Sequence, residues 1–294
     1  MKYTPWMFLL AASVRAATAD AETELAAALK RLEAHKNYSW ETTVTPAYVS
    51  TEVVLETPPD DGLPTQRREV TREAVAISGR TDSGRGTLIE GIVSQNGQPV
   101  TMKVAIWNDR RVAETPEGWY TQREIEAAAK ALETTVSSPE RWNAENAFPT
   151  GDHRLGPSNY IYAGRFYMTL QPPLDELRLL LAAGGQPVVM DGTIVQTLGE
   201  ATATKFWHEL RFRDAAASTD NPPRNVEGRI SIWRKNGEIT NYEVVITGDV
   251  VSSAYDPVYR GREHTVRLVK TTKLGGFDLT EVAIPTKALA RLNE

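Results

Sequence analysis

Two stretches of the chain alternate apolar and polar residues with the period of a β-strand that buries one face. Residues 100–107 place their apolar side chains on one parity, while Thr101 and Lys103 take the other. Because successive side chains of a strand point to opposite sides of a sheet, the apolar parity is predicted to face the core. The inward residues of this strand are Val100, Met102, Val104 and Ile106.

The last third of the chain repeats this pattern around a hairpin. Asn236-Gly237 separates two alternating runs in residues 228–248, and this dipeptide is favoured in tight turns that need positive φ. Residues 262–274 add a further strand of the same character. The inward-facing set predicted here is Ile230, Ile232, Tyr242, Val244, Ile246, Val266 and Leu268.

Other segments are rich in strand formers or in turn residues. Asn96-Gly97 predicts a second tight hairpin, Asp191-Gly192 predicts a short strand pair, and Pro46 is predicted to interrupt the first strand region. The strands predicted in this way cover 37–57, 69–78, 86–95, 98–107, 110–114 and 278–285, and residues 159–170 are predicted to form a strand or a packed loop.

Helical sequence patterns mark five further segments. Leu25, Leu29 and Leu32 form one apolar stripe, and Thr121 and Glu124 are spaced as a capping box. Prolines, which a helix tolerates at its start, open two of the segments. The predicted helices cover 21–36, 121–134, 172–183, 200–212 and 286–292.

The order of these elements favours an α+β fold with an antiparallel sheet, because the regular βαβ alternation of a doubly wound sheet is missing. The 294 residues are 41% hydrophobic and 24% charged, which is ordinary for a globular protein with one sizeable core. No linker rich in Gly, Pro or Ser divides the chain. Residues 20–294 are therefore predicted to form a single domain.

The N-terminus has the features of a signal peptide. Lys2 supplies a basic start, residues 6–14 an apolar stretch, and residues 17–19 a small-residue cleavage site. Residues 1–19 are therefore predicted to be removed on export, which would leave a soluble periplasmic or secreted protein. Arg15 shortens the apolar stretch, and the alternative is an amphipathic N-terminal helix of a cytosolic protein.

Composition excludes several classes of function. The chain contains no cysteine, which rules out disulfides, thiolate metal sites, cysteine nucleophiles and a lipid anchor on an N-terminal cysteine. Removing Lys2 and Arg15 from the 33 basic residues leaves 31 against 38 acidic residues, a formal charge of −7. Because the net charge is negative and the charged residues are spread along the chain, we expect no nucleic-acid partner.

No motif indicates catalysis or metal binding. The G-x-S-x-G elbow is absent, and residues 79–86 predict a turn better than a phosphate-binding loop. The acidic pairs Asp60-Asp61 and Asp175-Glu176 are predicted to lie in a loop and in the first turn of a helix, where acidic residues suit the dipole. The four histidines show no metal-ligand spacing and are predicted to be solvated or hydrogen-bonded at the surface. They are His35, His153, His208 and His264. We therefore expect no enzyme activity, no cofactor and no metal.

The order of elements and a few short motifs resemble a known family. The predicted signal peptide and amphipathic helix are followed by Tyr38-x-Trp40, then by hairpins, by residues 236–243 (NGEITNYE) and by Val282-Ala283-Ile284-Pro285 before the last helix. In these features the chain resembles the periplasmic lipoprotein carriers (LolA-like) and the related lipid-binding lipoproteins. The resemblance implies a strongly bent, incomplete antiparallel β-barrel whose concave face is covered by helices, with an apolar cavity for acyl chains.

The resemblance also implies a function. A soluble periplasmic carrier or binding protein would shield lipidated or other apolar ligands from water without catalysis. Its partners would be acyl chains or lipoproteins, with an inner-membrane release complex as a further candidate. The cavity candidates are Met102, Val104, Ile106, Ile230, Ile232, Tyr242, Val244, Ile246, Val266 and Leu268. The alternative is an exported scaffold or interaction domain with a filled half-barrel core, because inward apolar residues look the same in both cases.

Overall fold

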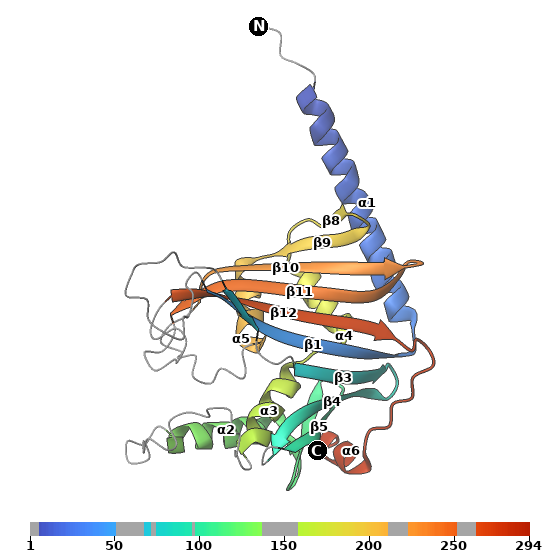
Figure 1. Cartoon of the computed structure of the whole chain (residues 1–294). Helices are drawn as coiled ribbons and strands as arrows, with labels where there is room; N and C mark the ends of the chain where they lie inside the picture. Colours follow the sequence, from blue (N-terminus) through green and yellow to red (C-terminus); the bar gives the residue numbers. More distant parts are fainter. Residues whose placement is uncertain are drawn as a thin grey trace, which may run out of the picture. The chain divides into compact units, whose positions relative to one another are not determined.

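The computed structural model describes residues 6–50, 68–71, 75–95, 98–136, 158–210, 223–251 and 263–294 (Figure 1). The chain divides into two units, and strand β1 (Asn37–Ser50) contributes to both. Unit 1 comprises residues 1–34, 43–74 and 174–273, and unit 2 comprises residues 35–42, 75–173 and 274–294. The predictions that residues 1–19 are cleaved and that residues 20–294 form one domain stay predictions. Within the described residues, no helix has the length and apolar character needed to cross a bilayer.

Unit 1 is built on antiparallel strands in the order β12-β11-β10-β9-β8, and β2 pairs with β1. Figure 1 shows α4 and α5 on one side of these strands. Its elements are α1 (Trp6–Ala34), β2 (Arg68–Thr71), α4 (Pro173–Ala182), β8 (Val188–Met190), β9 (Thr193–Leu198), α5 (Glu200–Leu210), β10 (Arg224–Lys235), β11 (Glu238–Val251) and β12 (Glu263–Gly275).

Unit 2 is built on antiparallel strands in the order β7-β6-β5-β4-β3. Its elements are β3 (Val75–Asp82), β4 (Gly86–Gln95), β5 (Gln98–Trp107), β6 (Arg110–Thr115), β7 (Gly118–Thr121), α2 (Gln122–Val136), α3 (Ser158–Thr169) and α6 (Thr286–Leu292). The strand order ends at β7 and at β8, so the sheet does not close. The predicted fold class, α+β with an open antiparallel sheet, is confirmed.

Local sequence signals account for several elements. Asn236 and Gly237 both have positive φ, 55° and 81°, which is the backbone that the predicted hairpin turn requires. The capping box is also present, because the Thr121 amide and hydroxyl donate to Glu124 at 2.7 and 2.8 Å. In α1, Leu25 and Leu32 are buried as expected. The turn at Asn96-Gly97 and the acidic pair Asp60-Asp61 lie outside the described residues, as does His153.

Residues Ser158–Thr169 form helix α3, so the predicted strand or packed loop over 159–170 is wrong. The alternating parity that suggested a strand coexists with helical spacing, and Phe166 and Tyr167 are buried against the sheet of unit 2. Gly164 permits this approach, because a Cβ there would lie 2.9 Å from a side-chain carbon of β5. Packing on the sheet therefore selected the helical spacing over the strand alternation.

The strand predicted over 278–285 is also wrong. The chain turns at Asp278, whose amide donates to the carbonyl of Asn37 at 2.8 Å, and residues 280–285 run outside the sheet. Val282 and Ile284 nevertheless pack into the core of unit 2. They are therefore covered by tertiary contacts without joining a strand ladder. Strand β1 runs through Pro46 without interruption, so the break predicted there is also wrong.

Helices cover both faces of the unit 2 sheet. One face carries Met102 and Val104, and α3 packs on β4, β5 and β6. The opposite face carries Ala105 and Val112, which form a buried cluster with Leu292 of α6. The expected helical cover is therefore present on this sheet, and α6 with the segment before it buries the second face as well.

Candidate functional site

The ten predicted cavity residues are all buried, but they belong to two different units. Met102, Val104 and Ile106 lie on β5 of unit 2. The other seven lie on β10, β11 and β12 of unit 1, where they share one face. This face of strands β9–β12, which bears Ile230 and Val244, is called the inner face below. Its role as a ligand-binding surface stays a prediction.

The strand register arranges the inner face in rows that run across the sheet. Directly paired residues of antiparallel strands lie on the same face. One row is apolar throughout: Leu198, Gly228, Ile246 and Leu268. The next contains Gln196, Ile230, Val244 and Lys270, and the third contains Ile194, Ile232, Tyr242 and Thr272. Polar groups therefore enter the inner face in two adjacent rows.

Three of the buried polar residues form one cluster, here called the Glu176 cluster: Glu176, Tyr242 and Lys270. The Lys270 ammonium pairs with one carboxylate oxygen of Glu176, and the Tyr242 hydroxyl donates to the other. The side chains of Glu176 and Lys270 are only 3% and 4% exposed. A carboxylate and an ammonium at this depth require each other, because either one alone would be an uncompensated buried charge.

Strand parity places Lys270 in this cluster. Lys270 has the same parity on β12 as Val266 and Leu268, and all three are buried. Its direct cross-strand neighbour is Val244, and its ammonium reaches Glu176. The predicted inward set contained only the apolar residues of this parity, although the same alternation also places Lys270 on the inward side.

Helix spacing places Glu176 in the cluster. Glu176 and Leu177 lie on the same buried side of α4 as Leu180, while Asp175 and Arg178 are exposed. Glu176 does lie in the first turn of α4, as predicted. Its side chain is nevertheless part of the core, so an account based only on the helix dipole is incomplete. The predicted pair Asp175-Glu176 is thus split between solvent and interior.

The inner face is filled at its centre in the described state. Ile230, Ile232, Tyr242 and Val244 each have 0% exposure. A cavity that admitted water-sized molecules would leave accessible area on the atoms lining it. These residues therefore pack directly on other protein atoms, as in a close-packed core.

Helix α5 contributes the largest side chain of this core. Trp207 is 1% exposed, and a Cβ added to Gly248 on β11 would lie 3.0 Å from its ring. Ala203, one turn earlier on α5, faces Gly228 of β10 in the same way, at 2.9 Å. The two glycines therefore allow α5 to lie close to the sheet.

Gln196 ties the end of α4 to the inner face. Its Nε2 donates to the carbonyl of Leu181 at 3.0 Å, and its Oε1 is buried without a hydrogen-bond partner among the described residues. Gly184 approaches so closely that a Cβ there would lie 2.3 Å from the Gln196 amide nitrogen. Gln196 was not among the predicted site residues, because its polar character hid its inward parity.

Three of the four histidines lie among the described residues, and each has different surroundings. His264 is 7% exposed on the inner parity of β12, so its predicted surface location is wrong. His35 lies 2.7 Å from the Asp278 carboxylate and stacks on Phe277 at a ring distance of 4.5 Å. His208 is exposed, as expected. Among the described residues, no three His, Asp or Glu side chains are grouped to hold a metal ion.

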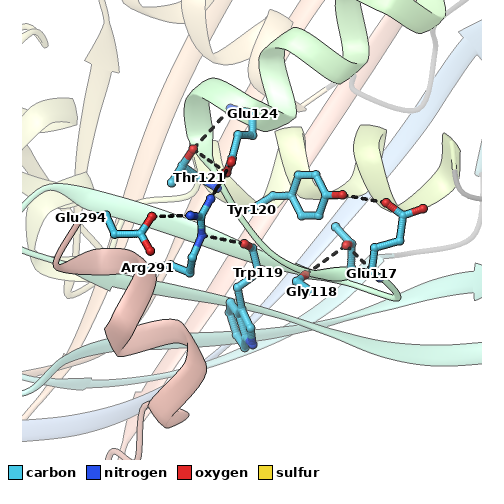
Figure 2. A network of polar contacts seen from close by, with 9 residues as sticks. Glu117, Gly118, Trp119, Tyr120, Thr121, Glu124, Arg291 and Glu294 are labelled. Atoms are coloured by element: carbon cyan, nitrogen blue, oxygen red, sulfur yellow. Dashed lines mark hydrogen bonds and ion pairs between the residues drawn. The ribbon is translucent and has the colours of Figure 1, made fainter.

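A second polar network lies in unit 2 and joins α6 to α2 (Figure 2). Arg291 donates to the Glu124 carboxylate, to Glu294 and, at 3.1 Å, to the carbonyl of Trp119. The hydrogen bonds from Arg291 are the main cause that lowers the pKa of Glu124 to about 2, followed by those from Thr121. This arrangement explains how the C-terminal helix is anchored and indicates no reaction chemistry.

The lowered pKa of Glu124 predicts a pH dependence of stability. The folded-state pKa is below the unfolded value of 4.5, so the contribution is fully present above about pH 4.5 and is lost as pH falls toward 2. We expect Glu124→Gln to flatten this part of the stability profile by at most about 1 kcal/mol, because the pair is solvent-screened. Urea unfolding across this pH range measures the change, and Glu126→Gln on the same helix is the control. An unchanged profile in Glu124→Gln would contradict the assignment.

A shallow surface depression of about 410 Å³ is lined by Glu126, Ala127, Lys130 and Arg165. Arg165 and Glu126 form an exposed ion pair across it at 3.2 Å. Exposed pairs of this kind are common on protein surfaces and contribute little energy. Its described lining residues are all exposed, so none of them is a buried polar group that would select a ligand.

Comparisons with known proteins find a weak similarity of fold. No protein-family model and no curated protein matches the chain. Among solved structures, it is similar to the lipoprotein LppX of Mycobacterium tuberculosis, with a TM-score of 0.34 and 8% identity, covering 90% of this chain and 98% of LppX. It is also similar to LprF from Mycobacterium bovis, with a TM-score of 0.35 and 12% identity, covering 92% of this chain and 97% of LprF. TM-scores this low carry no argument about function, which must come from the residues of the chain itself.

Proposed function

We propose that the protein is an exported, non-catalytic binding protein that carries apolar or lipidated ligands, as the periplasmic lipoprotein carriers do. The observation that carries this proposal is the contact between α4 and the inner face. Helix α4, which has 10 residues, contacts this face beside α5, and its contact contains the buried Glu176 cluster. A ligand would displace α4 and lie on the apolar side chains of the inner face.

The energetics of the cluster make such a displacement accessible. Burying an ion pair removes two charges from water, and their attraction only about offsets this desolvation. When α4 separates from the sheet, Glu176 and Lys270 regain favourable hydration. An all-apolar contact of equal area would gain no favourable hydration on separating. A ligand chain that covers the exposed rows would then restore about 25 cal/mol for each Å² of apolar area removed from water.

A second candidate function is favoured by a specific observation. The central inner-face residues have 0% exposure, which is what a filled core would show. In that case the protein would be an exported scaffold or interaction domain that binds no apolar ligand. The two candidates differ in whether the inner face ever opens.

Ile232→Gln tests the proposal at the centre of the inner face. We expect the unmutated protein to bind a fluorescent fatty acid saturably and the variant to bind it more weakly, because an amide would enter the apolar surface. The variant should also lose about 1–3 kcal/mol of stability, because the interior is closed without ligand. Fluorescence titration and thermal unfolding measure the two effects.

Val245→Gln is the matched control for this variant. Val245 lies on the opposite, half-buried face of β11, so its replacement should affect neither measurement strongly. Failure of the unmutated protein to bind any fatty acid, together with a large loss of melting temperature in Ile232→Gln, would support the filled core and remove the carrier proposal.

Export is tested separately by the N-terminus of the mature protein. The proposal expects cleavage after Ala19, within the segment that helix α1 spans in the full chain. Expression in a bacterial host and N-terminal sequencing of the exported fraction should give a chain that starts at or near Asp20. An intact Met1 in that fraction would contradict the predicted signal peptide.

A further inference from the structure

We infer that the ligand is an acyl chain with a carboxylate headgroup, and that Lys270 and Tyr242 bind this headgroup in place of Glu176. The inference rests on the proposed carrier function and specifies the chemistry of its ligand. In the described state, the Glu176 side chain is itself a carboxylate held in the interior by one ammonium and one hydroxyl. It occupies the position that the carboxylate of a fatty acid would take.

The two donors are fixed by the sheet, whereas the acceptor is supplied by a helix. Lys270 on β12 is paired with Val244, and Tyr242 on β11 is paired with Thr272, so the two donors are diagonal neighbours on adjacent strands. Diagonal neighbours on one face are within reach of long side chains. Glu176 comes from α4. If α4 moves away, the ammonium and the hydroxyl remain side by side and converge on one vacated carboxylate position.

The number of donors favours a carboxylate over other anions. Each oxygen of Glu176 accepts from one donor, Lys270 on one side and Tyr242 on the other. A phosphate monoester would bring a third oxygen and up to a second charge, and within the described part of the chain this cluster contains no second cation for it. The two rows that contain Lys270 and Tyr242 also carry Ile230, Val244 and Ile232, which are the apolar contacts that an acyl chain needs.

The charge of Lys270 would determine which apolar ligands bind, more than it would raise the affinity for the preferred one. Exchange of Glu176 for a ligand carboxylate keeps Lys270 paired, so the electrostatic change is small. A neutral ligand in the same place would leave Lys270 buried without a counter-charge, which is strongly unfavourable. We therefore expect a saturated fatty acid to bind at least tenfold more tightly than the alcohol of the same chain length.

Calorimetric titration of the unmutated protein with a fatty acid, its alcohol, its methyl ester and an alkyl phosphate of matched length tests the inference. The acid should bind best. In the double variant Glu176→Leu/Lys270→Met the acid and the alcohol should bind with similar affinity, and Tyr242→Phe should reduce the preference several-fold. Lys273→Met, which removes an exposed lysine from the same strand, should retain the full preference.

The outcomes separate this inference from the carrier proposal. Equal binding of acid and alcohol by the unmutated protein would overturn the inference and leave the carrier proposal standing. An acid preference that survives in a folded Glu176→Leu/Lys270→Met variant would also overturn it, as would tighter binding of the alkyl phosphate. Absence of binding by all four ligands would remove both. The comparison among ligands on the unmutated protein does not depend on how well any variant folds.

Discussion

Replacing Lys270 with methionine lowers the free energy of unfolding by about 3–5 kcal/mol, because it leaves the Glu176 carboxylate buried without a counter-charge. Methionine has a similar length and keeps the apolar contacts of the lysine stem, so the loss reports the missing charge and not a cavity. The side chains of both partners are almost fully buried, at 4% and 3% exposure, so solvent cannot substitute for the ammonium. Denaturant unfolding followed by circular dichroism measures the loss.

The double variant Glu176→Leu/Lys270→Met provides the decisive comparison. Removing both charges eliminates the uncompensated carboxylate, so this variant should lie within about 2 kcal/mol of the unmutated protein despite the lost Tyr242 hydrogen bond. Lys273→Met is the surface control and should change stability by less than about 0.5 kcal/mol. If Lys270→Met is no less stable than this control, the pair is not buried as described and the headgroup site loses its basis.

Trp207→Ala is the second substitution with a large expected effect. Trp207 is 1% exposed and its ring packs over Gly248, so truncation would leave a large cavity between α5 and β11. Truncations of this kind cost about 3–5 kcal/mol through the lost transfer energy and the cavity that remains. Thermal and denaturant unfolding should both show this loss.

The neighbouring residue provides the control for Trp207. His208 is exposed on the same helix, so His208→Ala removes a side chain of α5 without opening the core. Its effect should stay within about 0.5 kcal/mol. A loss below about 1 kcal/mol in Trp207→Ala would mean that α5 does not cover this part of the sheet.

These two predictions concern different parts of the cover over the inner face. Trp207 of α5 provides apolar packing, while Glu176 of α4 provides a charge that must stay paired. In the carrier proposal, α5 is therefore the stable part of the cover and α4 the part that separates. Acceleration of hydrogen exchange in α4, but not in α5, on addition of a fatty acid would fit this division.

The sequence by itself determined the elements whose signals are local. The turn at Asn236-Gly237 needs positive φ at both positions, which few other dipeptides tolerate, and the Thr121–Glu124 cap depends on residues three apart. The inward parity of Val244 and Leu268 followed from alternation, because a slip of one residue would expose the whole apolar set. The antiparallel α+β class followed from the order of these elements.

The tertiary structure alone decided where short-range signals are ambiguous or silent. Alternating residues in Ser158–Thr169 fit a helix as well as a strand, and packing on the unit 2 sheet selected the helix. Val282 reaches the core without joining the sheet. Above all, a lysine and a glutamate 94 positions apart in the chain look like surface residues until both are found in the same interior. Burial of a charge depends on a partner that the fold brings to it, and no local pattern can reveal that partner.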